Sequence, residues 1–304
     1  YHRFNENKYP STNIDMEIFK KHIDLIKSKN LAFYNPAEFT KNFNNTKNNK
    51  SVLITIDDAY TSFYENAWPY LRENKIPFIL FVSTEPVGKF GYMNWDQIRE
   101  IEKSKFGYIG NHSHSHEYLV KFSFENFKKD INESIKIFEK MLGYNPEFFS
   151  YPFGEYSFEQ KSFIKANFKN AFGQHSGVID VNKDIYELPR FPINEKYGEL
   201  ERFSFIVNLN PFEYRKLIIK DTLLTQNENP PKIMVNFFDD QTNLSNLNCF
   251  SNEGEGWSKS QIKIVNKILE IKFDEKFNVR RGRINCSLKD DIGWRWFGIQ
   301  FVFN

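Results

Sequence analysis

Short apolar runs recur along the first two-thirds of the chain and predict buried strands. They cover residues 51–56, 78–82, 147–151 and 170–173, with a weaker run at residues 106–109. The runs are continuous rather than alternating with polar residues. This pattern is typical of parallel strands that are covered on both faces.

Amphipathic segments separate these runs and predict helices. The clearest covers residues 123–142, and Gly143 follows it at the position of a helix C-cap glycine. Residues 157–160, Ser-Phe-Glu-Gln, match a capping box that opens a further helix. The apolar positions of the first segment recur at helical spacing: Phe127, Ile131, Ile135, Phe138 and Leu142. Alternating strands and helices indicate a parallel sheet or an α/β barrel, with the functional side chains at the carboxyl ends of the strands.

The pattern changes after Asn229-Pro-Pro, where candidate strands continue and helical spacing ends. In residues 294–303 apolar and polar positions alternate, which indicates an antiparallel strand with one buried face. The apolar positions on that face are Phe297, Ile299, Phe301 and Phe303. We therefore divide the chain into an α/β domain of residues 1–228 and a small antiparallel, sandwich-like β domain of residues 229–304.

Composition narrows the class of protein. The 304 residues are 40% hydrophobic and include 33 Phe, which supports a packed core and argues against disorder. The net charge is +2 with mixed signs along the chain, so no basic tract favours nucleic acid as a partner. No apolar run reaches the length of a membrane span.

The chain starts at Tyr1 rather than Met, as removal of a signal peptide would leave it, so we expect an exported protein. Its two cysteines, Cys249 and Cys286, are too few for a disulfide scaffold. Export permits one bridge between them, and we predict that bridge within the β domain.

Two adjacent carboxylates, Asp57 and Asp58, close the first buried run. Their mutual repulsion needs a compensating cation, and a bound metal would leave one Asp as ligand and the other as a base. A helix N-cap would also place an Asp here. The pair alone does not decide between these two interpretations.

Three of the six histidines lie in His112-Ser-His-Ser-His116, directly after another predicted strand. Imidazoles are ordinary ligands of Zn²⁺ and similar metals. His112 and His116 with one Asp would form a three-ligand site that leaves positions open for water. A His-rich surface loop is the alternative, and the Asp pair at a neighbouring strand end argues against it.

Three further positions end predicted strands or follow them. The turn Tyr151-Pro-Phe-Gly154 could aim a backbone N–H at a developing oxyanion, although alone it is only a turn. His175 is a candidate catalyst, and Arg190 is a candidate to hold Asp57 ionised. His175 could instead be a structural histidine with its hydrogen bonds satisfied, and Arg190 could instead form a surface ion pair.

Together these segments resemble the polysaccharide deacetylase superfamily, also called the NodB-homology family or carbohydrate esterase family four. Thr55-Ile-Asp-Asp-Ala59 looks like its first motif, Thr-Phe-Asp-Asp-Gly, and the His112–His116 segment looks like its second, His-(Ser/Thr)-x-x-His. The turn at Tyr151 looks like its third motif. That form and the opening Tyr1-His-Arg-Phe4 are similar to the poly-N-acetylglucosamine deacetylase subgroup.

The resemblance implies a distorted (β/α) barrel with fewer than eight complete units. It implies a divalent metal, most often Zn²⁺ with Co²⁺ or Ni²⁺ as alternatives, held by Asp58, His112 and His116. It also implies Asp57 as general base and the backbone N–H of Phe153 as an oxyanion donor.

Three departures from the family pattern matter. Ala59 replaces the motif glycine. Ser150 stands where many members carry an Arg that tethers the base, so Arg190, or failing that Arg3, is expected to take this role. The late Leu-x-His motif with the general acid is missing, and His175 is assigned as the acid because no other histidine follows the cluster.

The resemblance implies a hydrolase that removes N-acetyl groups from an N-acetylglucosamine-containing cell-surface polysaccharide or peptidoglycan. The alternatives are a glycan O-acetyl esterase, a deacetylase of lipid-linked sugars and a non-catalytic carbohydrate-binding protein. In the β domain Trp257, Trp294 and Trp296 could stack on sugar rings, and the basic run 280–283 could meet an anionic glycan. Because Trp in small β domains is more often core, we favour a packing role for this domain.

Overall fold

The computed structural model describes residues 1–41, 50–180, 182–240, 243–254, 256–273 and 275–303. Its first part is built on a curled parallel sheet with the strand order β5-β6-β7-β8-β9. The strands are β5 (Ile54–Asp57), β6 (Phe78–Val82), β7 (Gly107–Asn111), β8 (Phe148–Ser150) and β9 (Asn170–Phe172). This sheet is the partial barrel that the sequence predicts.

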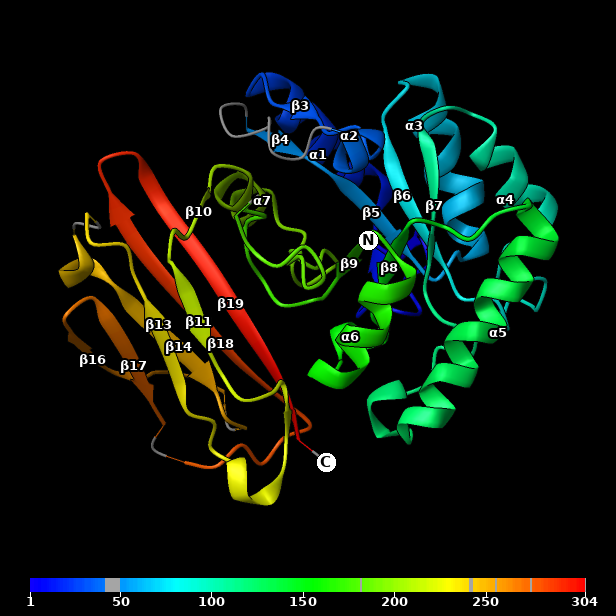
Figure 1. Ribbon diagram of the computed structural model, residues 1–304. Coiled ribbons are helices and arrows are strands. Elements are labelled where there is room, and N and C mark those ends of the chain that lie inside the picture. Colours follow the sequence, from blue (N-terminus) through cyan, green and yellow to red (C-terminus); the bar gives the residue numbers. More distant parts are fainter. Residues whose placement is uncertain (42–49, 181, 241–242, 255, 274, 304) are drawn as a thin grey trace.

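The helices follow the strands along the chain, and α3, α4 and α5 lie together on one side of the sheet (Figure 1). They are α1 (Met16–Ser28), α2 (Ala37–Lys41), α3 (Trp68–Glu73), α4 (Trp95–Glu102), α5 (Phe124–Leu142), α6 (Phe158–Asn167) and α7 (Leu200–Val207). The helix predicted at residues 123–142 is confirmed, and Gly143 ends it with a φ of 86°. The capping box at Ser157 is also present.

The first predicted strand is interrupted at Leu53. Residues on its N-terminal side form β4 (Ser51–Val52), which pairs in parallel with β3 (Ala32–Phe33). The residues after Leu53 form β5, which pairs with β6. A second short pair joins β1 (Arg3–Phe4) to β2 (Asn13–Ile14) and places the first residues of the chain close to the end of β5.

The second part is a sandwich of two sheets. One sheet has the order β10-β19-β18-β14-β15 with β12 also on β19, and the other has the order β11-β13-β17-β16. The strands are β10 (Asn210–Pro211), β11 (Lys216–Ile218), β12 (Leu223–Leu224), β13 (Ile233–Asn236), β14 (Asn248–Asn252), β15 (Trp257–Lys259), β16 (Gln261–Val265), β17 (Ile268–Lys272), β18 (Arg281–Asp290) and β19 (Gly293–Phe303). Figure 1 shows β18 and β19 on the side of the sandwich that faces the barrel.

The sandwich extends further towards the N-terminus than the composition change at Asn229 suggests. Strands β10, β11 and β12 precede that residue and pair with β19, β13 and β19. They are too short to give a periodic signal, so the sequence pattern placed them with the barrel. Two of these strands run parallel to β19, so the domain is antiparallel only in its main ladders.

The alternation predicted for residues 294–303 is present in β19. Phe297, Ile299 and Phe301 are buried in the sandwich core together with Cys249 and Cys286. The side chains of Trp296 and Gln300 lie on the other face, towards the barrel, where the Trp296 indole donates to Ser176 Oγ at 2.9 Å. The β domain therefore packs directly on the barrel.

Cys249 and Cys286 are joined by a disulfide, as predicted from the sequence. They are directly opposed on β14 and β18, so the bond fixes the register of these two strands. Replacing both residues by alanine is expected to lower the free energy of unfolding of the β domain by about 2–4 kcal/mol. Urea denaturation followed by tryptophan fluorescence measures this change. An unchanged midpoint in the double variant would show that the bond contributes nothing.

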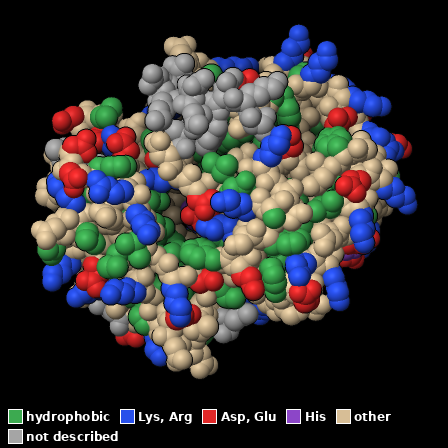
Figure 2. All heavy atoms as spheres, in the orientation of Figure 1, with side chains coloured by type: hydrophobic (Ala, Val, Ile, Leu, Met, Phe, Trp, Pro, Cys, Tyr) green, Lys and Arg blue, Asp and Glu red, His purple; other side chains and the backbone are tan. Residues whose placement is uncertain are grey.

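Acidic and basic side chains are interspersed over the face of the molecule shown in Figure 2, in keeping with the small net charge. Among the described residues no helix is both long enough and apolar enough to cross a membrane.

Candidate active site

Three side chains from two strand ends converge on one point. Asp58 follows β5, and His112 and His116 follow β7. Each offers a ligand atom, and these atoms lie within 4.8 Å of one another. The Nε2 atom of His116 is 3.0 Å from Asp58 Oδ1, and that of His112 is 3.5 Å from the same oxygen. Parallel strands end at one edge of the sheet, which is why residues so far apart in sequence meet here.

The backbone turn after β5 separates the two adjacent carboxylates. Asp58 and Ala59 have φ angles of 75° and 54°, both in the left-handed region. Asp58 lies against the two histidines, and Asp57 Oδ2 is 3.9 Å from His112 Nε2. Ala59 occupies the position where glycine would be unstrained, at a cost of about 1 kcal/mol.

The histidine loop is held by a buried carboxylate that the sequence analysis overlooked. Asp130, on α5, accepts hydrogen bonds from the backbone N–H groups of His114 and Ser115 at 2.9 and 3.1 Å. An acid between the apolar positions of an amphipathic helix was the available signal. His114 lies within hydrogen-bond distance of Thr84 Oγ1 (2.9 Å), outside the group of three ligand atoms.

The three-residue group fits a divalent metal. His112 donates from Nδ1 to the Ser150 carbonyl at 2.6 Å, which leaves the Nε2 lone pair free. Both His112 Nε2 and Asp58 Oδ1 are buried and make no hydrogen bond. Buried polar atoms without a partner are costly, and a cation bound between them would satisfy both.

Asp57 is held on its other side by Arg190. The two guanidinium nitrogens contact the two carboxylate oxygens at 2.7 and 2.9 Å. Arg190 also donates to Gly173 O, Thr55 Oγ1 and Ser150 Oγ, so its donors are fully used. Arg3, the other candidate, instead pairs with Glu6 and lies over the rings of Tyr9 and Tyr60.

Electrostatics keep both carboxylates ionised. Burial alone would raise the pKa of Asp57, but the Arg190 guanidinium, with His112 and His2, holds that pKa well below its usual range. Burial also acts on Asp58, where His116 outweighs it and lowers the pKa. Burial lowers the pKa of His112 to about 4, which favours the neutral, ligating imidazole.

Phe153 lies beside the histidines in the turn after β8, with a left-handed φ of 59°. Its ring is 4.9 Å from that of His116 and is stacked at 4.4 Å on Tyr118. Neighbouring contacts come from the β domain. Gln300 donates to the carbonyls of Phe153 and Gly154 at 3.1 and 3.2 Å, and Glu155 binds two arginines that precede or open β18.

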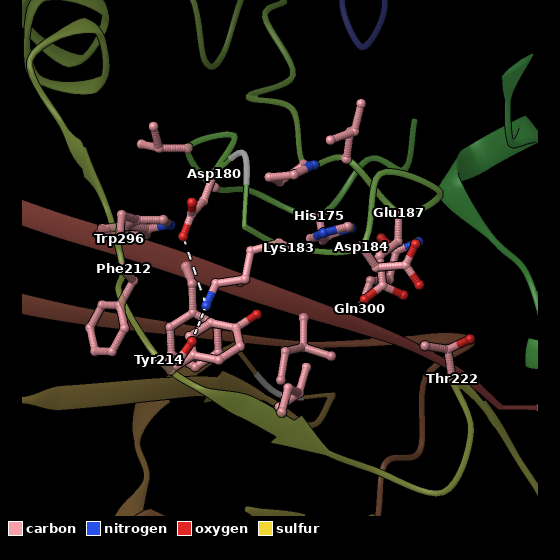
Figure 3. Close-up of a pocket in the computed structure, with 18 of the residues that line it drawn as sticks. His175, Asp180, Lys183, Asp184, Glu187, Phe212, Tyr214, Thr222, Trp296 and Gln300 are labelled. Atoms are coloured by element: carbon pink, nitrogen blue, oxygen red, sulfur yellow. Dashed lines mark hydrogen bonds and ion pairs between the residues drawn. The ribbon is translucent and has the colours of Figure 1, made fainter. Parts of the chain in front are cut away.

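The backbone carbonyl of His175 accepts the N–H of Arg190 at 3.0 Å, but its ring is turned towards another place. Its ring lines a separate cavity of about 60 Å³ between the barrel and the β domain, with Lys183, Asp180 and Trp296 in its wall (Figure 3). Gln174, one residue earlier, takes the inward direction and reaches Asp57 Oδ2 at 3.5 Å. Burial lowers the pKa of His175 to about 4.

His2 is the histidine outside the cluster that reaches the site. The backbone N–H of Asp57 donates to the carbonyl of Tyr1 at 2.9 Å, so the start of the chain runs alongside β5. This places His2 Nε2 4.0 Å from Asp57 Oδ2.

The family model and two curated relatives that this chain matches are all described as deacetylases of polysaccharides. A family model described as polysaccharide deacetylase matches residues 44–167. A poly-beta-1,6-N-acetyl-D-glucosamine N-deacetylase of Staphylococcus aureus is 30% identical over 192 residues, which are 58% of this chain and 66% of the relative. The chain thus spans just under two thirds of the length of this curated relative. A putative polysaccharide deacetylase of Bacillus subtilis is 25% identical over 146 residues, which are 48% of this chain and 52% of the relative.

Two solved structures are similar to about two thirds of this chain. The deacetylase PplD of Streptococcus pyogenes superposes with a TM-score of 0.61 at 20% identity, covering 68% of this chain and 95% of that one. IcaB from Ammonifex degensii gives a TM-score of 0.59 at 23% identity, covering 68% of this chain and 94% of that one. At these identities the likeness concerns the fold.

Proposed function

We propose that this chain, which is similar to polysaccharide deacetylases, is a member of that family and removes N-acetyl groups from an N-acetylglucosamine-containing glycan by metal-dependent hydrolysis. The observation that carries the proposal is one arrangement of side chains. Asp58, His112 and His116 converge with two unsatisfied buried ligand atoms, and Asp57 lies beside them as an ionised carboxylate bound by Arg190.

The substrate class follows from the relatives. The staphylococcal relative is named for poly-β-1,6-N-acetylglucosamine, so we propose an N-acetylated polysaccharide or peptidoglycan of the bacterial cell surface as the substrate. A substrate outside the cell requires an exported enzyme. The Cys249–Cys286 disulfide supports export, because such bonds persist in oxidising compartments.

A divalent metal, in our proposal Zn²⁺ with Co²⁺ or Ni²⁺ as alternatives, would polarise the acetamide carbonyl and lower the pKa of a water when bound by Asp58, His112 and His116. The Ser150 carbonyl fixes the His112 ring with Nε2 facing the other two ligands. Asp130 fixes the loop that carries His116.

Asp57 is the proposed general base. It accepts the proton of the attacking water while Arg190 keeps the carboxylate in place and ionised. The backbone N–H of Phe153, in the turn held by Gln300, is the proposed donor to the oxyanion that forms on the acetamide carbonyl.

The departing amine needs a proton, and we propose His2 as its donor in place of His175. His2 lies near Asp57 and is not one of the proposed metal ligands, whereas His175 lines another cavity. Replacing His2 by glutamine is expected to lower kcat by about 10–100-fold, at or below the usual size of a general acid–base contribution. His175→Gln is the matched control and is expected to retain near-normal kcat. Steady-state acetate release measures both variants, and a larger loss in His175→Gln would return the acid to that residue.

The proposed function is tested by acetate release from chitooligosaccharides, poly-β-1,6-N-acetylglucosamine and peptidoglycan, each with and without a chelator. Free amine in the product identifies an N-deacetylase, and free hydroxyl identifies an O-acetyl esterase. Binding of glycan without any acetate release would instead indicate a non-catalytic carbohydrate-binding protein.

A further inference from the structure

The outer face of the larger β-domain sheet continues from the candidate site into solvent. Side chains along β14 and β18 alternate strictly between the sandwich core and this outer face. The outer positions of β14 include Phe250 and Asn252, and those of β18 include Arg283 and Asn285. Trp257 on the edge strand β15 is 49% exposed and Phe250 is 41% exposed. Exposed aromatics on one sheet face are a feature that core packing does not explain.

One row of directly opposed residues crosses this sheet from its edge to the active site. Trp257 is opposite Asn252, Asn252 is opposite Arg283, and Arg283 is opposite Gln300. Directly opposed residues in antiparallel strands project from the same face. The row therefore presents an indole, an amide and a guanidinium in sequence and ends at Gln300, which is buried beneath the turn that carries Phe153. It spans three strand spacings of about 4.8 Å each.

Gln300 connects the row to the turn after β8 that carries Phe153. Its side-chain oxygen accepts a hydrogen bond from Arg283 Nε at 3.1 Å, and its side-chain nitrogen donates to the carbonyls of Phe153 and Gly154. The Phe153 ring contacts that of His116. The row thus runs from Gln300, which holds the turn whose Phe153 ring contacts His116, to an exposed tryptophan about 14 Å beyond Gln300.

We propose that the row Trp257–Asn252–Arg283, with Phe250 beside it, is an extended subsite that binds the N-acetylated glycan strand on one side of the residue being deacetylated. The inference rests on the proposed function for the identity of the glycan. The occupant is a continuation of the strand in the active site, because the row is continuous with the turn that carries Phe153.

The side chains of the row suit this occupant. Indole and phenyl faces stack on the apolar faces of sugar rings, while amide and guanidinium groups hydrogen-bond hydroxyl and acetamide groups. Two tryptophans of this sheet have different surroundings. Trp296 is bonded to Ser176 and lies near Phe205, so it joins the two domains, whereas Trp257 is on an edge strand with exposed neighbours.

The disulfide fixes the register of the two central strands of the subsite, β14 and β18. Cys249 and Cys286 are opposed next to the pair Phe250 and Asn285. A slip of one residue would move every outer side chain of β14 to the opposite face. The bond therefore maintains the register that places Asn252 opposite Arg283.

Trp257→Ala is the variant that tests the subsite. It is expected to raise KM for poly-β-1,6-N-acetylglucosamine about tenfold, the effect of losing roughly 1.4 kcal/mol of stacking, with kcat unchanged. Activity on a disaccharide, too short to reach Trp257, is expected to stay the same, and Trp257→Phe is expected to restore most of the affinity. Phe250→Ala is a second variant with the same expected direction.

Trp294→Ala is the matched control. Trp294 is 39% exposed on the same sheet but is paired with Lys289, outside the row, and is expected to leave KM unchanged. An equal rise in KM for Trp294→Ala, or an unchanged KM for both Trp257→Ala and Phe250→Ala, overturns the subsite.

Calorimetric titration with the same polymer separates this inference from the proposed function. If the parent protein releases no acetate but binds the polymer more tightly than Trp257→Ala does, the proposed function fails and the subsite stands. If the parent protein and Trp257→Ala bind the polymer equally, or neither binds it, the subsite is wrong whatever the acetate assay shows.

Discussion

Replacing Asp58 by alanine is expected to abolish metal binding and acetate release together. The substitution removes one of three converging ligands, the only carboxylate among them. It leaves the two imidazoles of His112 and His116. Loss of an outer-shell partner alone typically costs about 10–100-fold in metal affinity, so loss of a ligand should exceed about 100-fold. Metal content after dialysis, measured by mass spectrometry, and acetate release should fall in parallel.

His114→Ala is the matched control for this prediction. His114 lies in the same five-residue segment as His112 and His116, but Thr84 is the side chain within hydrogen-bond distance of its ring. The variant should keep a full complement of metal. Loss of metal from His114→Ala to the same extent as from Asp58→Ala would contradict the assignment of ligands.

Chelation of the parent protein should reproduce the effect of Asp58→Ala reversibly. Activity should return on adding Zn²⁺, Co²⁺ or Ni²⁺ to the chelated parent protein but not to Asp58→Ala, because the variant lacks the ligand that the ions need. Recovery of Asp58→Ala with excess metal would show that the two histidines suffice.

The sequence predicted the part of this molecule that depends on strand ends. Asp57 and Asp58 after one apolar run, and His112 and His116 after another, meet because parallel strands end at a common edge. The pairing of Arg190 with Asp57 was also accessible, since a buried base needs a cation and few candidates were available. These inferences need only the order of strands and residue chemistry.

The sequence did not reveal which side chains of the extended segments point into the site. His175 was assigned as the acid because no other histidine follows the cluster, yet Gln174 takes the inward position and His175 lines the cavity of Figure 3. A shift of one residue in an extended segment reverses the side-chain direction, and composition carries no record of it. His2 reaches the site only because the start of the chain runs alongside β5.

The sandwich has strands before residue 229, and the sequence did not reveal them for a different reason. Strands β10 and β12 are two residues long and are stabilised by pairing with β19, far along the chain. Periodicity cannot mark strands this short, because their stability is tertiary. The same strand β19 carries Gln300, so the contact between the β domain and the catalytic turn was also invisible to local patterns.

Asp57→Asn is expected to lower kcat by about 10²–10⁴-fold while metal content stays near normal. The asparagine preserves shape but cannot accept a proton from water. Asp57 is outside the group of three ligand atoms, so the metal should remain. Acetate release and metal content measured on the same preparation test both halves of the prediction.

The substitution also removes the carboxylate that neutralises Arg190, and a buried cation without its partner is destabilising by about 3–5 kcal/mol. Thermal unfolding of Asp57→Asn must therefore be measured beside the assay. It distinguishes activity lost through unfolding from activity lost with the base. Ser150→Ala separates the two effects, because it removes one neutral acceptor of Arg190 and leaves the carboxylate in place. If Asp57 is the base, Ser150→Ala should retain most of kcat at a slightly lower melting temperature, whereas Asp57→Asn should stay inactive even where it is fully folded. A folded Asp57→Asn protein with near-normal turnover would place the base elsewhere.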